Sequence, residues 1–330
     1  MSDVMTDTLS ILGTGVYLPP ARTVQEVVSE AGGDGSIFKG WENVCHALDE
    51  DHPSSMGADA LQRALEDSGV DAADLRLVIF AGMSRDYLPS YSVATEVMKT
   101  CEIPGDCVGL DLTIGCLGAL SALDLAHGWL AVRGGGLAAV VTAERWSYTV
   151  DHSSSASYGL WAHADGAAAA VVGMNTKHAS KAEFAGAETV TQSDLNGSII
   201  IKYGGTQNPV APEGVNPAER EILTLEGIDR RERYAQGYSG SFEAMEKRFG
   251  IRPNKVICNQ TAVLFLDLIA SVIDIPIENF LITGHETGHV GSADILIGLD
   301  RLLKSGELTE PYLMAGSTPF AFASGLLKPA

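Results

Sequence analysis

The sequence predicts an α/β protein of two similar halves, in which helices cover both faces of parallel or mixed sheets. Apolar runs of strand length alternate with longer stretches of helical period along the whole chain, an alternation typical of such sheets. The same rhythm returns in the second half, which suggests an internal duplication. At 330 residues, 45% of them hydrophobic, the chain can bury a large core.

The predicted elements follow in order along each half. The first half, residues 1–175, is expected to hold strands at Leu9–Leu18, Leu75–Gly82, Asp106–Leu112, Gly136–Ala143 and Ala167–Gly173, and helices at Ser55–Ser68, Ser92–Thr100 and about Cys116–Val132. The second half, residues 176–330, is expected to hold helices near Phe242–Phe249 and at Thr261–Ile273 and Gly291–Ser305, and strands at Lys255–Cys258, Phe280–Thr283, Tyr312–Ala315 and Ala321–Leu326. The segment Thr189–Tyr238 is polar and rich in Gly and Pro, so we expect loops over a cleft there.

Composition and charge narrow the classes of partner. Lys and Arg total 22 against 42 Asp and Glu, a formal net charge of −20, which argues against nucleic acid because phosphate backbones are bound by clustered cations. No apolar run reaches the roughly 18–20 residues that a membrane helix needs. The first ten residues have neither the basic start nor the apolar stretch of a signal peptide. We therefore expect a cytoplasmic protein that binds neither nucleic acid nor membrane.

The cysteines indicate reduced thiols and no metal. The chain has five of them, Cys45, Cys101, Cys107, Cys116 and Cys258, and none forms a zinc-type pattern with another Cys or with His. In a reducing compartment most are expected to be buried, with one or two reactive. No metal and no other cofactor is predicted.

Cys116 is the candidate nucleophile. In DLTIGCLGAL it follows an extended run and begins an apolar helix. The unpaired N–H groups and partial positive charge of a helix N-terminus favour a thiolate and can hold an oxyanion. Gly115, Gly118 and Ala119 are expected to leave room for a substrate. The competing interpretation is a buried cysteine that only fills space at a strand–helix junction.

The chain as a whole resembles the ketoacyl synthase III family of the thiolase superfamily, from about Leu9 to the C-terminus. DLTIGCLGAL resembles the nucleophile motif of that family, and HADGAAAAVV, which begins at His163, resembles its Asp-Gly strand. Ser55-Met56-Gly57 is similar to the start of its first long helix, and Leu88-Pro89-Ser90 to its dimer-side loop. The resemblance implies a thiolase fold of two αβαβα halves, Cys116 as nucleophile and a homodimer.

The partner residues depart from the family pattern. Ketoacyl synthases III place a His and then an Asn opposite the cysteine, whereas this chain has Asn259 in KVICNQTAV and His289 in TGHVGSADILIGLD. Thiolases have the order found here, but they also need a second cysteine near the C-terminus, where this chain reads MAGSTPFAFASG. The chain thus retains the means of acylation and lacks the means by which each family makes a carbanion.

The expected chemistry assigns a role to each of these residues. His289 can act as general base, and Asn259 can hydrogen-bond an oxyanion or fix a water. Asp294 or Glu286 can orient the imidazole; for Asp294 the alternative is a first-turn carboxylate that satisfies the helix dipole. We expect His285 to be a loop residue.

The C-terminal loop also departs from the family, which uses a glycine N–H there as an oxyanion donor. This chain has Ser317-Thr318-Pro319, so Ser317 or Thr318 is the remaining candidate donor, because Pro319 has no N–H. Leu88 stands where the family often has a bulkier side chain that limits acyl length. We therefore expect the space for the acyl chain to differ from that in the family.

The identity of the acyl donor is suggested by two missing cations. Gly40-Trp41-Glu42 lacks the arginine that helps the family hold coenzyme A, and Leu264 replaces the basic residue that helps dock an acyl carrier protein. An acidic surface should repel an acidic carrier protein, which favours acyl-coenzyme A or a small acyl-pantetheine thioester as the donor. Lys247-Arg248 and the cluster Arg230, Arg231 and Arg233 are candidates to compensate for the missing cations. Arg145, Trp146, Tyr148 and Trp161 are candidates for lining an acceptor pocket.

Together these residues predict an acyltransferase of specialised (secondary) metabolism. It would move an acyl group through acyl-Cys116 to a small-molecule hydroxyl or amine acceptor. The first alternative is a decarboxylative ketoacyl synthase III that forms a carbon–carbon bond, and the second is a non-catalytic acyl-binding partner subunit.

Overall fold

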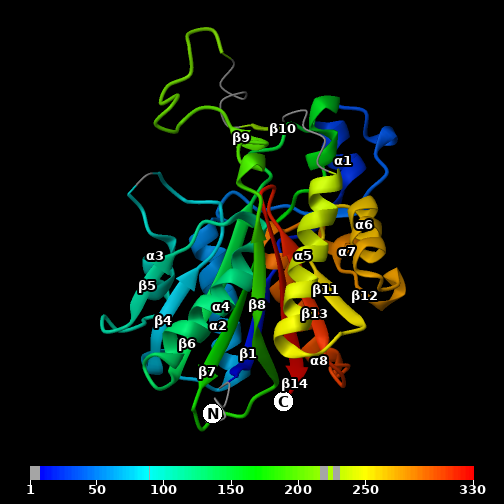
Figure 1. Ribbon diagram of the computed structural model, residues 1–330. Helices are drawn as coiled ribbons and strands as arrows, with labels where there is room; N and C mark the ends of the chain where they lie inside the picture. Colours follow the sequence, from blue (N-terminus) through cyan, green and yellow to red (C-terminus); the bar gives the residue numbers. More distant parts are fainter. Residues whose placement is uncertain (1–7, 89, 216–221, 226–230) are drawn as a thin grey trace.

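A computed structural model describes residues 8–88, 90–215, 222–225 and 231–330, and its centre is a mixed sheet of ten strands (Figure 1). The strand order is β12-β11-β13-β14-β8-β1-β7-β6-β4-β5. The strands are β1 (Leu9–Tyr17), β4 (Leu75–Phe80), β5 (Val108–Asp111), β6 (Gly136–Arg145), β7 (Asp165–Met174), β8 (Ala182–Thr191), β11 (Lys255–Cys258), β12 (Phe280–Leu281), β13 (Tyr312–Ser317) and β14 (Ala321–Pro329). Two small sheets pair β2 (Ala21–Thr23) with β3 (Asn43–Cys45) and β9 (Ile199–Ile201) with β10 (Leu223–Leu225).

The two halves of the large sheet have the same topology. In the first, β4 runs parallel to β5 and β6, β6 pairs antiparallel with β7, and β7 with β1. In the second, β11 runs parallel to β12 and β13, β13 pairs antiparallel with β14, and β14 with β8. A short antiparallel pairing of β1 with β8 joins them, from Leu9 opposite Phe184 to Ile11 opposite Ala182. The predicted α/β class with mixed sheets is confirmed.

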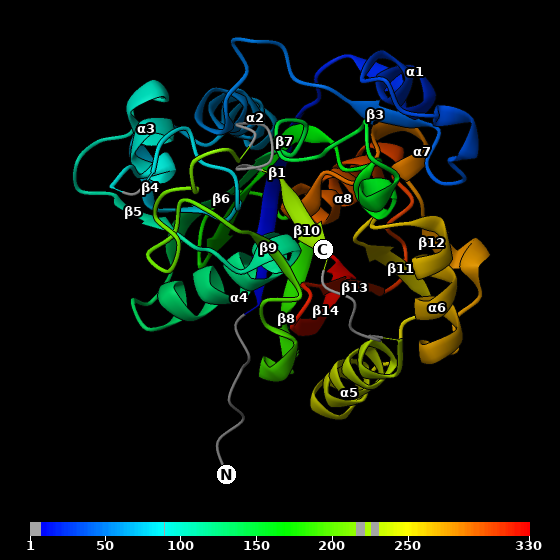
Figure 2. The ribbon, with the colours of Figure 1, turned by 90° about the horizontal axis from the view of Figure 1, so that it is seen from above.

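Helices pack on this sheet, and two of them contact strands of both halves. The helices are α1 (Val24–Glu30), α2 (Pro53–Ser68), α3 (Val93–Thr100), α4 (Gly118–Ala131), α5 (Arg231–Phe249), α6 (Val263–Ile273), α7 (Gly284–Thr287) and α8 (Asp294–Ser305). Helix α4 contacts β4, β6 and β7 but also β8, and α8 contacts β11 and β13 but also β1 and β7 (Figure 2). Each is entered through a single 3₁₀ turn, Gly115–Leu117 before α4 and Gly291–Ala293 before α8. The N-termini of both helices are therefore held close to the boundary between the halves.

The start of α4 is packed more closely than its small residues led us to expect. A Cβ added at Gly118 would lie 1.8 Å from the carbonyl oxygen of Ala81, and Ala119 is completely buried. These small residues let the helix approach the chain after β4. The expectation that Gly118 and Ala119 make room for a substrate is therefore wrong.

The element predictions fail mainly in the middle of the chain. Strand β8 was not predicted, because AEFAGAETVT mixes small and charged residues and so lacks a clear apolar alternation. Helix α5 spans Arg231–Phe249 among the described residues, whereas a helix was expected only near Phe242–Phe249, because the first half of α5 is polar and contains glycine. The sheet explains this glycine: a Cβ at Gly237 would lie 2.1 Å from the ring of Phe322 in β14. The predicted loop segment therefore contains strands and helix, although residues 216–221 and 226–230 lie outside the described part of the chain.

The helices of the described residues include none that is both long and apolar enough to cross a membrane.

Candidate active site

The sulfur of Cys116 lies in the 3₁₀ turn before α4. All five cysteines are free, and Cys116 is the one whose side chain is not fully buried. Gly115 has a φ of +62°, which forms the turn, and a Cβ there would lie 2.9 Å from the side chain of Thr318. Burial raises the pKa of the Cys45 thiol to about 12 and those of Cys101 and Cys107 to about 11. Those three thiols stay protonated at neutral pH and are poor nucleophiles.

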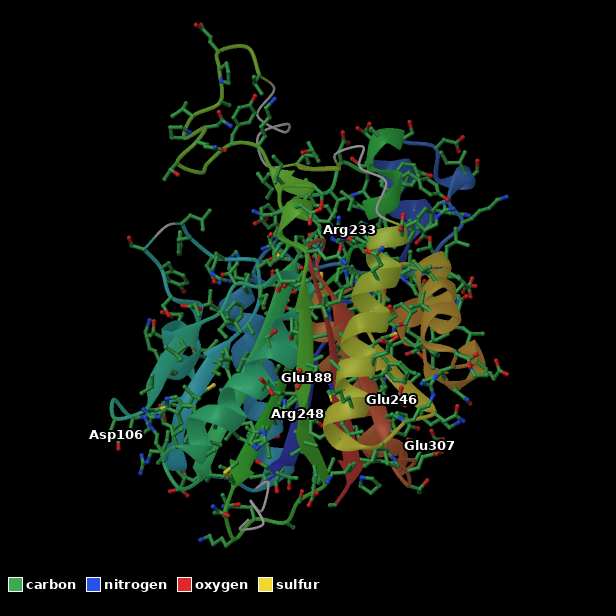
Figure 3. All side chains as sticks on the ribbon, viewed as in Figure 1. Asp106, Glu188, Arg233, Glu246, Arg248 and Glu307 are labelled. Carbon is green, nitrogen blue, oxygen red and sulfur yellow. The ribbon has the colours of Figure 1, made fainter. Side chains whose placement is uncertain are left out.

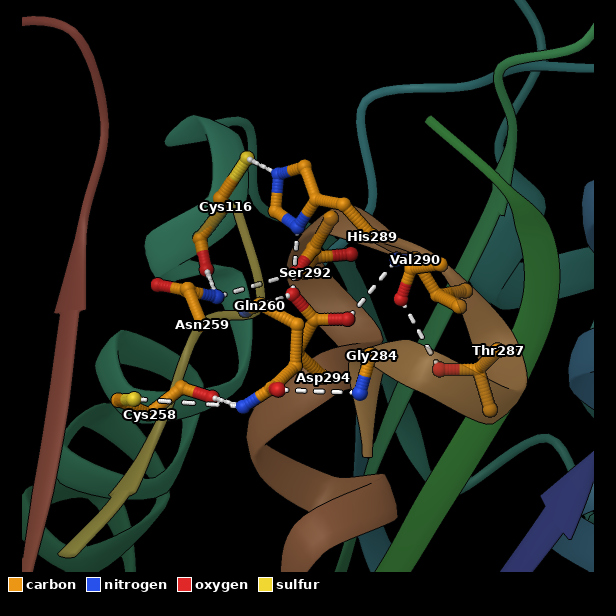
Figure 4. A network of polar contacts seen from close by, with 12 residues as sticks. Cys116, Cys258, Asn259, Gln260, Gly284, Thr287, His289, Val290, Ser292 and Asp294 are labelled. Carbon is orange, nitrogen blue, oxygen red and sulfur yellow. Dashed lines mark hydrogen bonds and ion pairs between the residues drawn. The ribbon is translucent and has the colours of Figure 1, made fainter. Parts of the chain in front are cut away.

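The imidazole of His289 lies beside this sulfur, with Nε2 at 3.4 Å from Sγ (Figure 4). The segment between α7 and α8 carries it, and two backbone hydrogen bonds tie this segment to the first half: His289 N to Ala162 O at 2.8 Å and Ala164 N to His289 O at 2.9 Å. Gly288 precedes it with a φ of +73°, and a Cβ there would lie 2.8 Å from Ala162 O. The Gly-His pair thus reflects a close approach of the two halves at the site.

Asp294, not Glu286, orients this imidazole. Its Oδ2 lies 2.5 Å from Nδ1 of His289, and both side chains are almost completely buried. The carboxylate also accepts the N–H of Gln260 at 2.7 Å and that of Val290 at 2.8 Å (Figure 4). Glu286 instead forms an exposed ion pair with Arg301.

The electrostatics of the site favour a protonated His289. Burial works to lower the pKa of His289, but the carboxylate of Asp294 and the sulfur of Cys116 outweigh it and raise this pKa to about 10. A protonated ring next to the sulfur stabilises a negative charge there. Sulfur, imidazole and carboxylate therefore form a continuous relay in which the proton is held on the central group.

The side-chain amide of Asn259 is fully occupied by backbone groups. Its Nδ2 donates to the carbonyl oxygens of Cys116 and Gly291, both at 3.1 Å, and its Oδ1 accepts the N–H of Ser317 at 3.1 Å. Both N–H groups of the amide are thus used. The expected hydrogen bond from Asn259 to an oxyanion has no free donor, and a water could be held only by the second lone pair of Oδ1. The residue joins the two 3₁₀ turns to the end of β13.

The backbone donors expected in the C-terminal loop are also occupied. The N–H of Ser317 is bonded to Asn259, and the N–H of Thr318 donates to Ala321 O at 2.8 Å. Both residues border the cavity that is described next. Their backbone N–H groups, however, are already bonded and cannot donate to a ligand in that cavity. The prediction of a backbone oxyanion donor at Ser317 or Thr318 is therefore wrong for this arrangement of the loop.

A cavity of about 610 Å³ opens above the sulfur. Its wall includes Cys116, His163 and His289 and is otherwise largely apolar, with contributions from Leu160, Ile199, Tyr234, Leu264, Phe265 and Leu268. Arg145, Trp146, Tyr148 and Trp161 do not line this cavity, so it gives no support to their predicted place in an acceptor pocket. His163 was not predicted as a site residue, because the resemblance of its motif to the family rests on the Asp-Gly pair that follows it.

Two family models match the chain. One, described as 3-oxoacyl-[acyl-carrier-protein (ACP)] synthase III, matches residues 110–193, and its C-terminal counterpart matches residues 242–326. The chain is 27% identical over 310 residues to the mycobacterial β-ketoacyl-[acyl-carrier-protein] synthase III of Mycobacterium tuberculosis, which covers 90% of this chain and 88% of the relative. It is 22% identical over 323 residues to the β-ketoacyl-[acyl-carrier-protein] synthase III of Rhodopirellula baltica, with 92% of both chains covered.

Solved structures agree with these matches. The 3-oxoacyl-[acyl-carrier-protein] synthase III of Aquifex aeolicus superposes with a TM-score of 0.82 at 20% identity, covering 97% of this chain and 99% of that one. A variant of OleA from Xanthomonas campestris superposes with a TM-score of 0.83 at 17% identity, covering 99% and 100%. The chain is a ketoacyl synthase III-like member of the thiolase superfamily. It has the thiolase-like fold and is an acyltransferase, so a non-catalytic acyl-binding subunit is not retained.

This ketoacyl synthase III-like chain carries its remaining predicted site residues on the surface. Leu88 is 76% exposed and does not line the cavity of its own chain, so the structure does not support its expected effect on acyl length within one subunit. Leu264 is 80% exposed at the rim of the cavity. Trp41, by contrast, is buried and donates its indole N–H to Gln260 O.

The basic residues expected to compensate for Leu264 are partly neutralised. Arg248 pairs with Glu188 at 2.8 Å (Figure 3). Arg233 pairs with Asp194 at 2.6 Å. Arg231 lines the cavity, and Arg230 lies outside the described residues.

Proposed function

We propose that this protein moves an acyl group from a coenzyme A or small pantetheine thioester, through an acyl thioester on Cys116, to a hydroxyl or amine of a small acceptor. The observation that supports it is the relay of Cys116, His289 and Asp294, with contacts of 3.4 Å and 2.5 Å at the floor of one cavity. A nucleophile, a base and a group that orients the base are the parts that acyl transfer needs.

The reaction proceeds in two steps. The Cys116 thiolate attacks the carbonyl carbon of the donor thioester, the carbon–sulfur bond to the donor breaks, and the departing thiolate takes the proton from His289. The acceptor hydroxyl or amine then gives its proton to the now neutral His289 while its oxygen or nitrogen attacks the acyl carbon. The bond to Cys116 breaks, and the site returns to its starting state with the proton on His289.

The alternative is formation of a carbon–carbon bond after decarboxylation, and the names of the relatives favour it, since they are ketoacyl synthases. Decarboxylation of a malonyl group leaves an enolate that needs hydrogen-bond donors. In this chain the amide of Asn259 gives both of its N–H groups to backbone carbonyls. This favours ester or amide formation over condensation.

The preference for a coenzyme A or pantetheine donor rests on charge. Leu264 is exposed at the cavity rim, and the chain carries a net charge of −20. Both work against docking of an acidic carrier protein, and the exposed Arg231, which also lines the cavity, offsets them in part. A homodimer, a cytoplasmic location and a role in specialised metabolism belong to the same proposal.

Intact-mass measurement tests it. The wild type, incubated with a panel of acyl-coenzyme A thioesters, should gain one acyl mass that Cys116→Ala does not gain, while Cys101→Ala, a buried cysteine, serves as the matched control and should gain it too. Addition of hydroxyl and amine acceptors should then remove the adduct and form an ester or amide. Release of carbon dioxide from malonyl-coenzyme A together with a 3-ketoacyl product would favour the alternative, and no adduct with any thioester would contradict both.

A further inference from the structure

A second imidazole, that of His163, borders the cavity next to His289. The two rings meet edge to face, with centroids 4.9 Å apart and planes at 85°. The backbones of the two residues are paired as neighbours in a parallel bridge, so the distance between the rings is fixed by the main chain. His163 is only half-buried, and it lines the cavity that also contains the sulfur of Cys116.

The surroundings of His163 define its protonation. Burial, with a further contribution from the charge of His289, lowers the pKa of His163 well below its usual value of 6.5 against an opposing contribution from the backbone of Leu160, so the ring is neutral at physiological pH. A neutral imidazole has one N–H donor and one acceptor nitrogen. Its Nδ1 is completely covered and has no hydrogen-bond partner within the described residues.

This orphan nitrogen favours one tautomer. Although the backbone of Leu160 is close, a proton on Nδ1 would have no acceptor in hydrogen-bonding geometry among the described residues, which costs more than an acceptor left unsatisfied. The proton is therefore better placed on Nε2. Since Nδ1 is covered, the accessible part of the ring is the remainder, and it faces the cavity.

Several of the donors expected to hold an oxyanion are already bonded to protein atoms. The amide of Asn259 and the N–H groups of Ser317 and Thr318 are bonded to protein atoms, and Pro319 has none. The N–H groups of the first turn at Cys116 remain, but tetrahedral intermediates of acyl transfer are usually held by more than one donor.

We propose that the Nε2–H of His163 donates a hydrogen bond to the carbonyl oxygen of the thioester as it becomes an oxyanion. This role rests on the acyl transfer proposed above, and no proton leaves His163 in it. The neutral ring suits the task, because the nearby His289 already carries the charge of the relay and a second imidazolium against it would be repelled.

Two substitutions separate this role from a structural one. His163→Phe keeps a flat ring and removes the donor, whereas His163→Gln keeps an N–H. We expect His163→Phe to slow acylation of Cys116 by about 10²–10³-fold in kcat, with little change in KM for the acyl thioester, and His163→Gln to restore most of the rate.

Alkylation of Cys116 by iodoacetamide is the internal control, because it forms no oxyanion. Its rate should be the same in both variants and the wild type. Equal acylation rates for His163→Phe and wild type would overturn the proposal, as would a parallel loss of alkylation, which would show that His163 acts through His289. A loss confined to Thr318→Val would assign the donor to that hydroxyl instead. A wild type that no thioester acylates would contradict the proposed function itself, which is a different result.

A measurement on the wild type keeps the proposal testable if a variant does not fold. Nitrogen NMR of histidine-labelled protein should show one neutral ring that carries its proton on Nε2 and does not titrate around neutral pH. A neutral ring protonated on Nδ1 at this position would overturn the proposal.

Discussion

The carboxylate of Asp294 offers the sharpest test of the relay, through the substitution Asp294→Asn. Its two oxygens receive three donors, from Gln260, Val290 and Nδ1 of His289. An amide of the same shape has one oxygen and one NH₂ group, so at least one of these donors would face another donor. We expect a loss of about 1–3 kcal/mol in the free energy of unfolding from this unsatisfied contact.

The effect on chemistry should be larger. Asp294 and Cys116 together raise the pKa of His289 from 6.5 to about 10 against the opposing effect of burial. Asp294 contributes most to this rise, so its loss should weaken the protonated imidazole that stabilises the Cys116 thiolate. Loss of the oriented tautomer adds to this, and in a Ser-His-Asp relay the same substitution costs about 10⁴-fold in kcat. We expect acylation to slow by about 10²–10⁴-fold.

Glu286→Gln is the matched control. It makes the same carboxylate-to-amide change three residues before His289, but at an exposed side chain that pairs with Arg301. Both variants should be assayed by intact mass after incubation with an acyl thioester, with folding checked by thermal unfolding. A folded Asp294→Asn that acylates as fast as Glu286→Gln would refute the reasoning, because the relay would then work without its carboxylate.

Three further predictions concern stability and thiol chemistry. The pKa of His289 in the folded protein is raised from 6.5 to about 10, so protonated His289 adds fully to the free energy of unfolding below about pH 6.5, and this contribution is lost as pH rises through about 10. The free energies of unfolding in urea of wild type and His289→Gln should therefore converge over that range. A difference that stays constant with pH would contradict the prediction. Iodoacetamide at neutral pH should add one mass, at Cys116, because the other four cysteines are buried; a second adduct on folded protein would argue against this. In α4, the methyl group added by Gly128→Ala would enter open space and should raise the free energy of unfolding by about 0.5–1 kcal/mol. The methyl group added by Gly118→Ala would collide with Ala81 O and should lower the free energy of unfolding by about 3 kcal/mol or more. Denaturant unfolding that ranks the two variants in the opposite order would disprove the packing argument.

The sequence alone was sufficient for the parts of the protein that depend on neighbouring residues. The alternation of apolar runs predicted the α/β class and, within a few residues, most strands and helices of the large sheet. The position of Cys116 at a strand–helix junction is also a local property. His289 and Asp294 are five residues apart, and a single turn between them is enough to bring the carboxylate to the imidazole.

The tertiary structure decided which polar groups remain free for chemistry. Asn259 and Cys116 are 143 residues apart in the chain, so no local pattern shows that the amide is used by backbone carbonyls. Helix α5 contains a glycine in its first half because Gly237 lies against the ring of Phe322, and His163 meets His289 because a backbone bridge joins the two halves. A hydrogen-bond donor can be counted from the sequence, but whether it is already bonded depends on contacts between distant segments, and these form only when the halves pack together.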